Sequence, residues 1–369
     1  MIECKAAVAT GDGRFQIDDI QVLHPVGTEV LVEMKAASLC HTDYDSLNWG
    51  FPIVLGHEGS GVVKAVGDGV NQVSIGDSVI LHWATSCGKC MQCRAGNEHI
   101  CENNSPVVAG PNFTPGHARK EGTSWKGENI RRSFNIGTLS EYTLVQQSAV
   151  VKNHCPQLPF AAASTISCGV MTGFGSVVNA ARVSPGDSVV VLGTGGVGLN
   201  VIQGARISGA DPIIAIDINQ SRLDMATTFG ATEVIQADNE DTGLLSAAEK
   251  VKKLTNGAGA DYAFECTAIP ELGAAPLAMI RNAGMAVQVS GIEQTIAVDM
   301  ELFEWDKTYI NPLYGKCRPQ TDFPKLISLY EQGDLRLEEL ITNTYSLNEL
   351  QLGFDDLLSG KNAKGAVIF

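Results

Sequence analysis

Two short segments of the chain bring together residue types that bind soft metals and move protons. The first is Cys40-His41-Thr42-Asp43 and the second, after a loop, is Gly56-His57-Glu58. Soft divalent metals prefer sulfur and nitrogen donors, and a catalytic zinc ion usually has three protein ligands and one open position. We take Cys40 and His57 as candidate zinc ligands and Cys168 as the best third ligand. The alternative is a core thiol and a core imidazole, because free cysteine is among the most buried residue types.

A second group of cysteines follows further along the chain. Cys87, Cys90, Cys93 and Cys101 lie within fifteen residues. Four thiolates can enclose one tetrahedral ion without an open position, which is typical of structural zinc. Disulfides are the alternative, but closely spaced cysteines in a chain without a visible export signal favour a metal. The spacing therefore predicts a structural zinc site and indicates nothing about the reaction.

A glycine-rich turn lies between a predicted strand and a predicted helix. The apolar run 188–192 leads into Gly193, Gly195, Gly196, Val197 and Gly198, and a helical pattern covers 199–208. Glycines at this spacing let the backbone approach a pyrophosphate, which the helix N-terminus stabilises. A second apolar strand ends at Asp217, whose carboxylate would accept bonds from ribose hydroxyls and select NAD over NADP. The alternative for the glycines is a structural turn without a nucleotide, and Arg222 is either a ribose contact or a solvated arginine.

Length, charge and composition narrow the class of protein. A chain of 369 residues exceeds one usual core, so two domains are expected. The net charge of -15 argues against nucleic acid and anionic membranes as partners. We find no N-terminal signal and no apolar stretch of about 18 residues or more that could span a bilayer. Ten cysteines then indicate reduced thiols and metal ligands in a cytoplasmic protein.

The predicted elements fall into two groups that would position these residues. Short strands at 5–8, 29–34 and 61–66, another near Val79, and a strand pattern at 139–151 suggest a barrel-like domain. Residues 102–138 have no clear period and are expected to form loops bordering a cleft, where Arg131 and Arg132 are either solvated or substrate contacts.

After a helical segment at 161–181, strands and helices alternate. Strands are expected at 213–216, 233–235, 261–264 and 285–289, with one helix ending at Leu254 and another before Gly284. This alternation predicts a doubly wound parallel sheet, hence an α/β protein. Helices at 323–330 and 347–358 and a closing strand at 366–369 would rejoin the first domain.

Together these motifs resemble the zinc-containing, medium-chain alcohol dehydrogenases over essentially the whole chain. The resemblance implies a β-rich, GroES-like catalytic domain over 1–169 and 314–369 and a Rossmann NAD-binding domain over 170–313. It implies two zinc ions per chain, a catalytic one on Cys40, His57 and Cys168 and a structural one on the cysteine group at 87–101.

The resemblance also implies roles for single residues. Asp43 would orient the ligating histidine, Glu58 would modulate the metal, and Thr42 would relay the alcohol proton. His41 would contact the pyrophosphate, and Thr172 and Val197 would support the nicotinamide ring. Two positions depart from the family pattern. Asp45 stands where some relatives end the relay on histidine, and Arg318 is displaced by about two positions from the family's pyrophosphate arginine.

The predicted function is oxidation of a primary or aromatic alcohol by NAD. Trp49, Trp83, Asn135 and Ile136 are the expected pocket residues. A first alternative is an NAD-dependent S-(hydroxymethyl)thiol dehydrogenase, because the pattern also resembles a bacterial subgroup that includes such enzymes. In those enzymes the glutathione-binding arginine would fall near Ser105, which argues against glutathione itself. A second alternative is a nucleotide-binding protein that keeps the fold but catalyses no reaction. The resemblance further implies a homodimer or homotetramer formed by edge pairing of the nucleotide domains.

Overall fold

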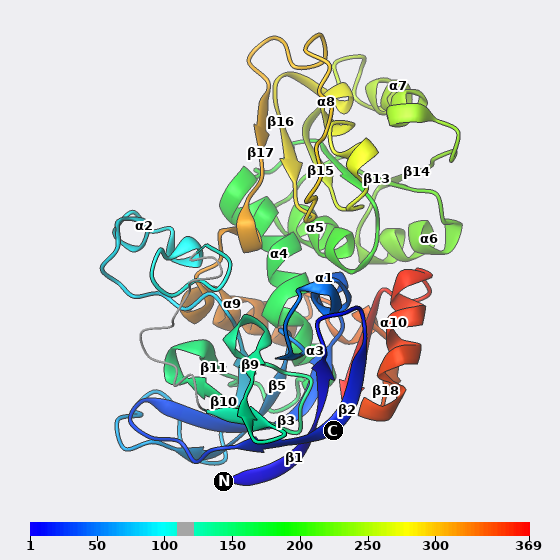
Figure 1. The fold of residues 1–369 in the computed structure, drawn as a ribbon. Helices are drawn as coiled ribbons and strands as arrows, with labels where there is room; N and C mark the ends of the chain where they lie inside the picture. The colour runs from blue at the N-terminus through cyan, green and yellow to red at the C-terminus, as the bar shows by residue number, and fades with distance from the viewer. Residues whose placement is uncertain (109–121) are drawn as a thin grey trace. The chain divides into compact units, whose positions relative to one another are not determined.

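The computed structural model describes residues 1–108 and 122–369, which form two compact units. The first unit contains Met1–Cys168 and Arg318–Phe369, and the second contains Gly169–Cys317. The C-terminal segment thus returns to the first unit, and the second unit is an insertion between its two parts (Figure 1). The part of the expected loop region at 109–121 lies outside the described residues.

The first unit is built on two sheets. One sheet has the order β8-β7-β2-β1-β4-β9, and the other has the order β11-β6-β5-β3-β19-β18, with β10 also paired to β3. The strands of the first sheet are β1 (Ile2–Ala9), β2 (Phe15–Val22), β4 (Ile53–Val54), β7 (Thr123–Trp125), β8 (Glu128–Asn129) and β9 (Arg131–Arg132). Those of the second are β3 (Glu29–Ser38), β5 (Ser60–Val66), β6 (Ser78–Leu81), β10 (Tyr142–Gln146), β11 (Val150–Lys152), β18 (Ile341–Tyr345) and β19 (Lys364–Ile368).

The first unit also contains several α-helices. They are α1 (His41–Asp45), α2 (Met91–Arg94), α3 (Phe160–Thr165), α9 (Pro319–Glu331) and α10 (Leu350–Leu358). Leu350, Phe354 and Leu357 recur at helical spacing, and all three are buried in a cluster with strand residues of both sheets. This packing explains why the C-terminal segment belongs to the first unit.

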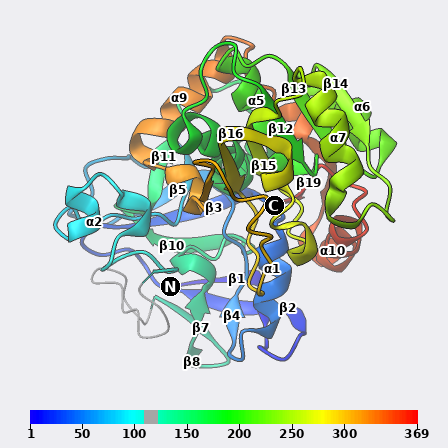
Figure 2. The same cartoon turned by 90° about the horizontal axis from the view of Figure 1, so that it is seen from above.

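The second unit is a doubly wound sheet in the order β14-β13-β12-β15-β16-β17, with all strands parallel. Its elements are α4 (Met171–Gly175), β12 (Val189–Leu192), α5 (Gly196–Ile207), β13 (Ile213–Asp217), α6 (Gln220–Phe229), β14 (Glu233–Gln236), α7 (Leu245–Leu254), β15 (Ala260–Glu265), α8 (Pro276–Met279), β16 (Ile280–Gln288) and β17 (Thr308–Ile310). Helices α5 and α6 pack together (Figures 1 and 2), as do α7 and α8 (Figure 1). This order is that of dinucleotide-binding folds, and it confirms the predicted fold class.

Two expectations about elements were wrong, and one was confirmed. Residues 122–138 contain β7, β8 and β9 rather than only loops. The helix expected before Gly284 is present as α8, which ends at Met279 because Ile280 already pairs with Ala260 and opens β16. We expected no apolar stretch long enough to span a bilayer, but the run in Phe160–Ala181 is long and apolar enough. Within the structure 72% of its most apolar window is buried, as in a core helix.

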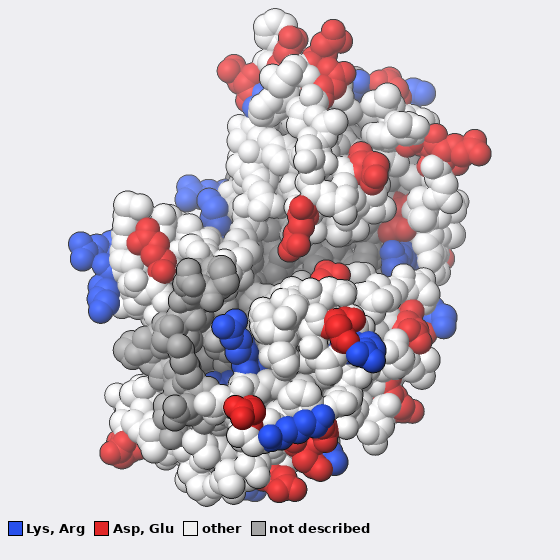
Figure 3. All heavy atoms as spheres, viewed as in Figure 1, with Lys and Arg blue, Asp and Glu red and all other residues white. Residues whose placement is uncertain are grey.

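On the face shown in Figure 3, the coloured side chains of both signs are interspersed, and the described residues form no continuous basic patch. Acidic side chains outnumber basic ones in the whole chain, 41 to 26.

A histidine in the first unit is buried without a charged partner. His82 is fully buried, its Nδ1 has no hydrogen-bond partner among the described residues, and its Nε2 lies 3.4 Å from the Gln320 amide. Desolvation lowers the pKa of His82 to about 3. The folded state therefore holds the neutral ring at pH values where the unfolded chain already binds a proton.

We expect acid to destabilise the protein through His82. As the pH falls from about 6.5 toward 3, this group alone should cost about 1.4 kcal/mol per pH unit. In His82→Phe, the loss of unfolding free energy between pH 7.5 and 5.0 should be about 2 kcal/mol smaller than in the wild type, by urea denaturation. His154→Phe, at a half-exposed histidine, should keep the wild-type pH dependence. An unchanged pH dependence in His82→Phe would contradict the explanation.

Candidate active site

Four side chains converge in the first unit, and three of them are the predicted zinc ligands. The ligand atoms of Cys40, His57, Glu58 and Cys168 all lie within 4.8 Å of one another. Cys40 precedes α1, His57 and Glu58 follow β4, and Cys168 lies in a π-helical stretch, Ile166–Val170, after α3. Such π-helical turns are often found at functional sites. Two sulfurs and one imidazole nitrogen form a donor set that suits zinc.

Asp43 connects helix α1 to the metal-site histidine. One carboxylate oxygen accepts a hydrogen bond from the Cys40 backbone N–H at 3.1 Å, and the other lies 2.7 Å from His57 Nδ1. Asp43 is fully buried. Its carboxylate thus fixes the tautomer that leaves His57 Nε2 as the metal-facing nitrogen, the usual arrangement for ligating histidines.

The side chains of the cluster shift one another's pKa values. Hydrogen bonding with Cys168 lowers the pKa of the Cys40 thiol well below its usual range, although burial opposes this, and the same contact raises the pKa of Cys168. Burial lowers the pKa of His57, but the Asp43 carboxylate outweighs it and raises this pKa overall. The lowered pKa of Cys40 favours a bound cation, because metal binding requires a deprotonated thiol.

Behind the cluster lies a buried ion pair that sequence reasoning missed. Lys364 Nζ lies 2.8 Å from both carboxylate oxygens of Glu58, and Ser38 Oγ donates to the same carboxylate. Lys364 also donates to the Leu39 carbonyl at 2.8 Å. Although burial lowers it, the neighbouring Glu58 carboxylate raises the pKa of Lys364 overall. A single lysine 306 residues from its partner gives no sequence signal.

Aromatic side chains cover the metal-site histidine. The ring centres of Phe134 and His57 lie 4.9 Å apart. The ring centres of Trp83 and Trp49 lie 5.4 Å and 5.8 Å from that of Phe134. Of the four predicted pocket residues, Trp49 and Trp83 therefore share a cluster with His57. Asn135 follows Phe134 in a left-handed turn, and Ile136 is buried with its carbonyl bonded to Thr143. Phe134 itself was not predicted, although its neighbours were.

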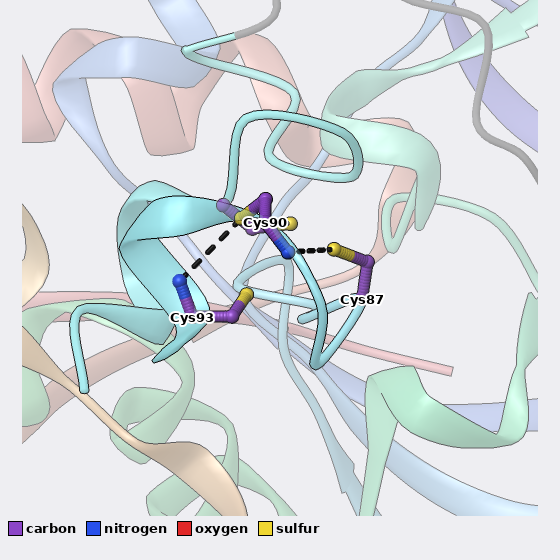
Figure 4. A group of neighbouring side chains, drawn as sticks. Cys87, Cys90 and Cys93 are labelled. Atoms are coloured by element: carbon purple, nitrogen blue, oxygen red, sulfur yellow. Dashed lines mark hydrogen bonds between the residues drawn. The ribbon is translucent and has the colours of Figure 1, made fainter. Parts of the chain in front are cut away.

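The second cysteine group converges as well. The sulfurs of Cys87, Cys90, Cys93 and Cys101 lie within 4.8 Å of one another, and the three side chains labelled in Figure 4 lie close together. Burial raises the pKa of Cys87, but hydrogen bonds from the Lys89 backbone and Asn103 lower it to about 6. All ten cysteines lie among the described residues, and all ten are free thiols. These are properties of a closed, four-thiolate zinc site.

At the carboxyl edge of the second unit's sheet, the glycine-rich turn is closed tightly. Gly193 has φ +82, and a Cβ on Gly198 would lie 1.9 Å from the Gly193 carbonyl oxygen. Next to Gly195, by contrast, a Cβ would meet nothing within 4 Å. Close backbone contact between Gly193 and Gly198 therefore fixes the turn, and the free space beside Gly195 is where a pyrophosphate would bind.

Asp217 and Glu265 hold the loops of this edge. Asp217 accepts hydrogen bonds from the Thr194 N–H at 2.8 Å and from the Asn219 N–H at 3.0 Å, and Arg222 lies 3.9 Å away. Glu265, fully buried and not predicted, accepts bonds from the backbone and hydroxyl of Thr267, each at 2.5 Å. A Cβ on Gly193 would touch Thr267, so Glu265 keeps this loop against the glycine turn.

The remaining predicted residues divide between the two units. His41 is exposed, Thr42 is partly buried in α1, and Arg318 is exposed at the start of α9 in the first unit. In the second unit, Thr172 precedes Gly173, where a Cβ would lie 2.4 Å from the Val197 carbonyl oxygen. The second unit therefore brings Thr172 and Val197 into one neighbourhood.

Known proteins resemble the chain over both units. The profile of the alcohol dehydrogenase GroES-like domain matches residues 27–159, and that of the zinc-binding dehydrogenases matches residues 196–332. Alcohol dehydrogenase B of Mycobacterium tuberculosis is 33% identical over 96% of this chain and 94% of its own length. S-(hydroxymethyl)glutathione dehydrogenase of Synechocystis is 32% identical over 99% of this chain and 100% of its own length. The structure of benzyl alcohol dehydrogenase from Acinetobacter calcoaceticus superposes with a TM-score of 0.88 at 30% identity, covering both chains fully.

Proposed function

The chain belongs to the zinc-dependent alcohol dehydrogenases, and on that premise we propose that it oxidises primary aromatic alcohols to aldehydes with NAD. The observation that carries this proposal is the contact between the His57 ring and Phe134, at 4.9 Å, within a cluster that includes Trp83 and Trp49. Offset and tilted ring packing stabilises aromatic groups beyond simple burial. An aryl ring is therefore the substrate group that this environment favours.

The donor set supports a catalytic zinc ion held by Cys40, His57 and Cys168. Such an ion, when bound, acts as a Lewis acid that lowers the pKa of an alcohol hydroxyl. We propose that Asp43 holds His57 in the ligating tautomer, that Thr42 Oγ1 accepts the alcohol proton, and that Glu58 modulates the metal's coordination. The rings of Phe134 and Trp83 would exclude water and orient the carbinol carbon.

For the cofactor, the open space beside Gly195 and the carboxylate of Asp217 fit NAD. NAD, when bound, takes up the hydride from the carbinol carbon. We propose that Gly193, Gly195, Gly196 and Gly198 hold the pyrophosphate, that Thr172 and Val197 support the nicotinamide, and that Asp217 repels the 2′-phosphate of NADP. His41, Arg222 and Arg318 are proposed as additional cofactor contacts.

The assembly is proposed to be a cytoplasmic homodimer or homotetramer. Among the described residues β17 pairs only with β16, which leaves one edge of the nucleotide sheet open. Trp305 and Met300, in the segment before β17, are 69% and 65% exposed. An open edge next to exposed apolar side chains favours pairing with a second copy.

The function is tested by NADH formation with purified, zinc-loaded protein. We expect turnover of benzyl alcohol with NAD and at least about tenfold lower kcat/KM with NADP, since repulsion of one phosphate is worth over 1 kcal/mol. Ethanol and a terpenoid alcohol serve as comparison substrates. Turnover of formaldehyde only in the presence of a low-molecular-weight thiol would instead favour the S-(hydroxymethyl)thiol reaction. Inactivity with every aromatic alcohol would contradict the proposal.

A further inference from the structure

A row of aromatic rings continues from the metal site toward the surface of the first unit. Beyond His57 and Phe134, the ring of Trp49 lies 5.8 Å from Phe134 and 6.3 Å from Phe51. At the end of the row, the guanidinium of Arg131 stacks over Phe51 at 4.8 Å from the ring centre. Trp49 is thus the link between the ring beside the metal site and the ring beside the arginine.

The backbone explains this arrangement. Strands β4 and β9 are parallel neighbours, with Ile53 opposite Arg131 and Val54 opposite Arg132. The carboxyl ends of the two strands lead to His57 and Phe134, and their amino ends carry Phe51 and Arg131. The metal site and the arginine therefore lie at opposite ends of one short strand pair, and the row of rings connects the two ends.

A cavity opens at the arginine end. It has a volume of about 260 Å³ and is lined by Phe51, Pro52, Asn129 and Arg131. Ligand pockets for whole small molecules usually span about 300–1,000 Å³, so this cavity fits one end of a molecule. Its lining offers one aromatic face, a guanidinium and a side-chain amide.

The positive charge at this end has no acidic partner among the described residues. The net charge is -15, yet no carboxylate of the described residues lies within ion-pair distance of Arg131. A guanidinium stacked on a ring keeps its N–H groups free in the plane, where they can bind a carboxylate with two parallel hydrogen bonds. The Asn129 amide adds a further donor.

We propose that the cavity at Arg131 is a distal subsite for a carboxylate, so that the preferred alcohols are elongated aromatic molecules with an anionic end. The carbinol group would lie beside His57, the rings along Phe134 and Trp49, and the carboxylate against Arg131 and Asn129. This inference rests on the proposed function, because it presupposes that the alcohol binds beside His57.

The test compares two rod-shaped substrates that differ only in the distal charge. These are biphenyl-4-methanol and 4′-(hydroxymethyl)biphenyl-4-carboxylate. In the wild type we expect the carboxylate to have a KM about tenfold lower at similar kcat, which is the effect of one charge-assisted contact. In Arg131→Gln this advantage should disappear, while kcat and KM for benzyl alcohol stay unchanged. Arg94→Gln, at another exposed arginine of the same unit, should retain the advantage.

Binding of the carboxylate is measured separately by quenching of tryptophan fluorescence. Arg131-dependent binding without turnover would support the subsite and contradict only the proposed reaction. Equal KM values for the two biphenyl alcohols in the wild type would overturn the subsite. It would also be overturned if Arg131→Gln weakened the neutral and the charged substrate equally, since that result indicates a structural role for the arginine.

Discussion

Replacing Cys168 by serine should abolish alcohol oxidation while leaving the fold and the cofactor site intact. Cys168 contributes one of the two sulfurs of the candidate catalytic cluster, whose ligand atoms lie within 4.8 Å of one another. Polarisation by a metal is worth several kcal/mol, and each 1.4 kcal/mol is about a factor of ten in rate. We therefore expect kcat/KM for benzyl alcohol to fall by about 10³-fold or more.

The zinc content makes this result specific. The variant should hold one zinc ion per chain by mass spectrometry, against two in the wild type, because the cysteine group at 87–101 is unchanged. Its affinity for NADH, measured by fluorescence, should stay at the wild-type value. Cys155→Ser is the matched control, because this thiol is also buried in the first unit but belongs to neither cluster. Full activity in Cys168→Ser would remove the catalytic-metal assignment.

Local sequence patterns predicted the parts of the site whose chemistry depends on spacing. The cysteines at 87, 90, 93 and 101 are close in sequence, so their convergence follows from a short loop. The turn at Gly193 was predictable for a similar reason, because a strand, a glycine run and a helix follow one another directly. The strand and helix alternation that follows predicts a parallel sheet, whereas its strand order is known only from the structure.

The parts that the sequence did not reveal depend on contacts between distant segments. Lys364 reaches Glu58 because β19 pairs with β3, and no local pattern encodes that pairing. Phe134 meets His57 because β4 and β9 are parallel neighbours of only two residues each, too short to give a periodic signal. Glu265 lies in an ordinary strand, and its role depends on the loops that bond to it.

Replacing Lys364 by methionine should strongly destabilise the first unit. Glu58 is fully buried, and its carboxylate would lose the cation that bridges both oxygens at 2.8 Å. Removing one partner of a buried pair typically costs about 3–5 kcal/mol, because the remaining charge stays desolvated. We expect a loss of this size in the free energy of unfolding, measured by urea denaturation with saturating zinc.

Two further variants distinguish the cost of leaving a buried carboxylate unpaired from the effect of removing any lysine. Lys361 also lies 2.8 Å from a carboxylate, that of Asp356, but its side chain is 68% exposed, so Lys361→Met should change the unfolding midpoint little. Adding Glu58→Gln to Lys364→Met removes the unpaired charge and should recover part of the lost stability, because the neutral amide costs less to bury. If Lys364→Met and Lys361→Met lowered the midpoint equally, the pair behind the metal site would have no special structural role. If the double variant recovered nothing, the loss would come from Lys364's bond to the Leu39 carbonyl rather than from Glu58.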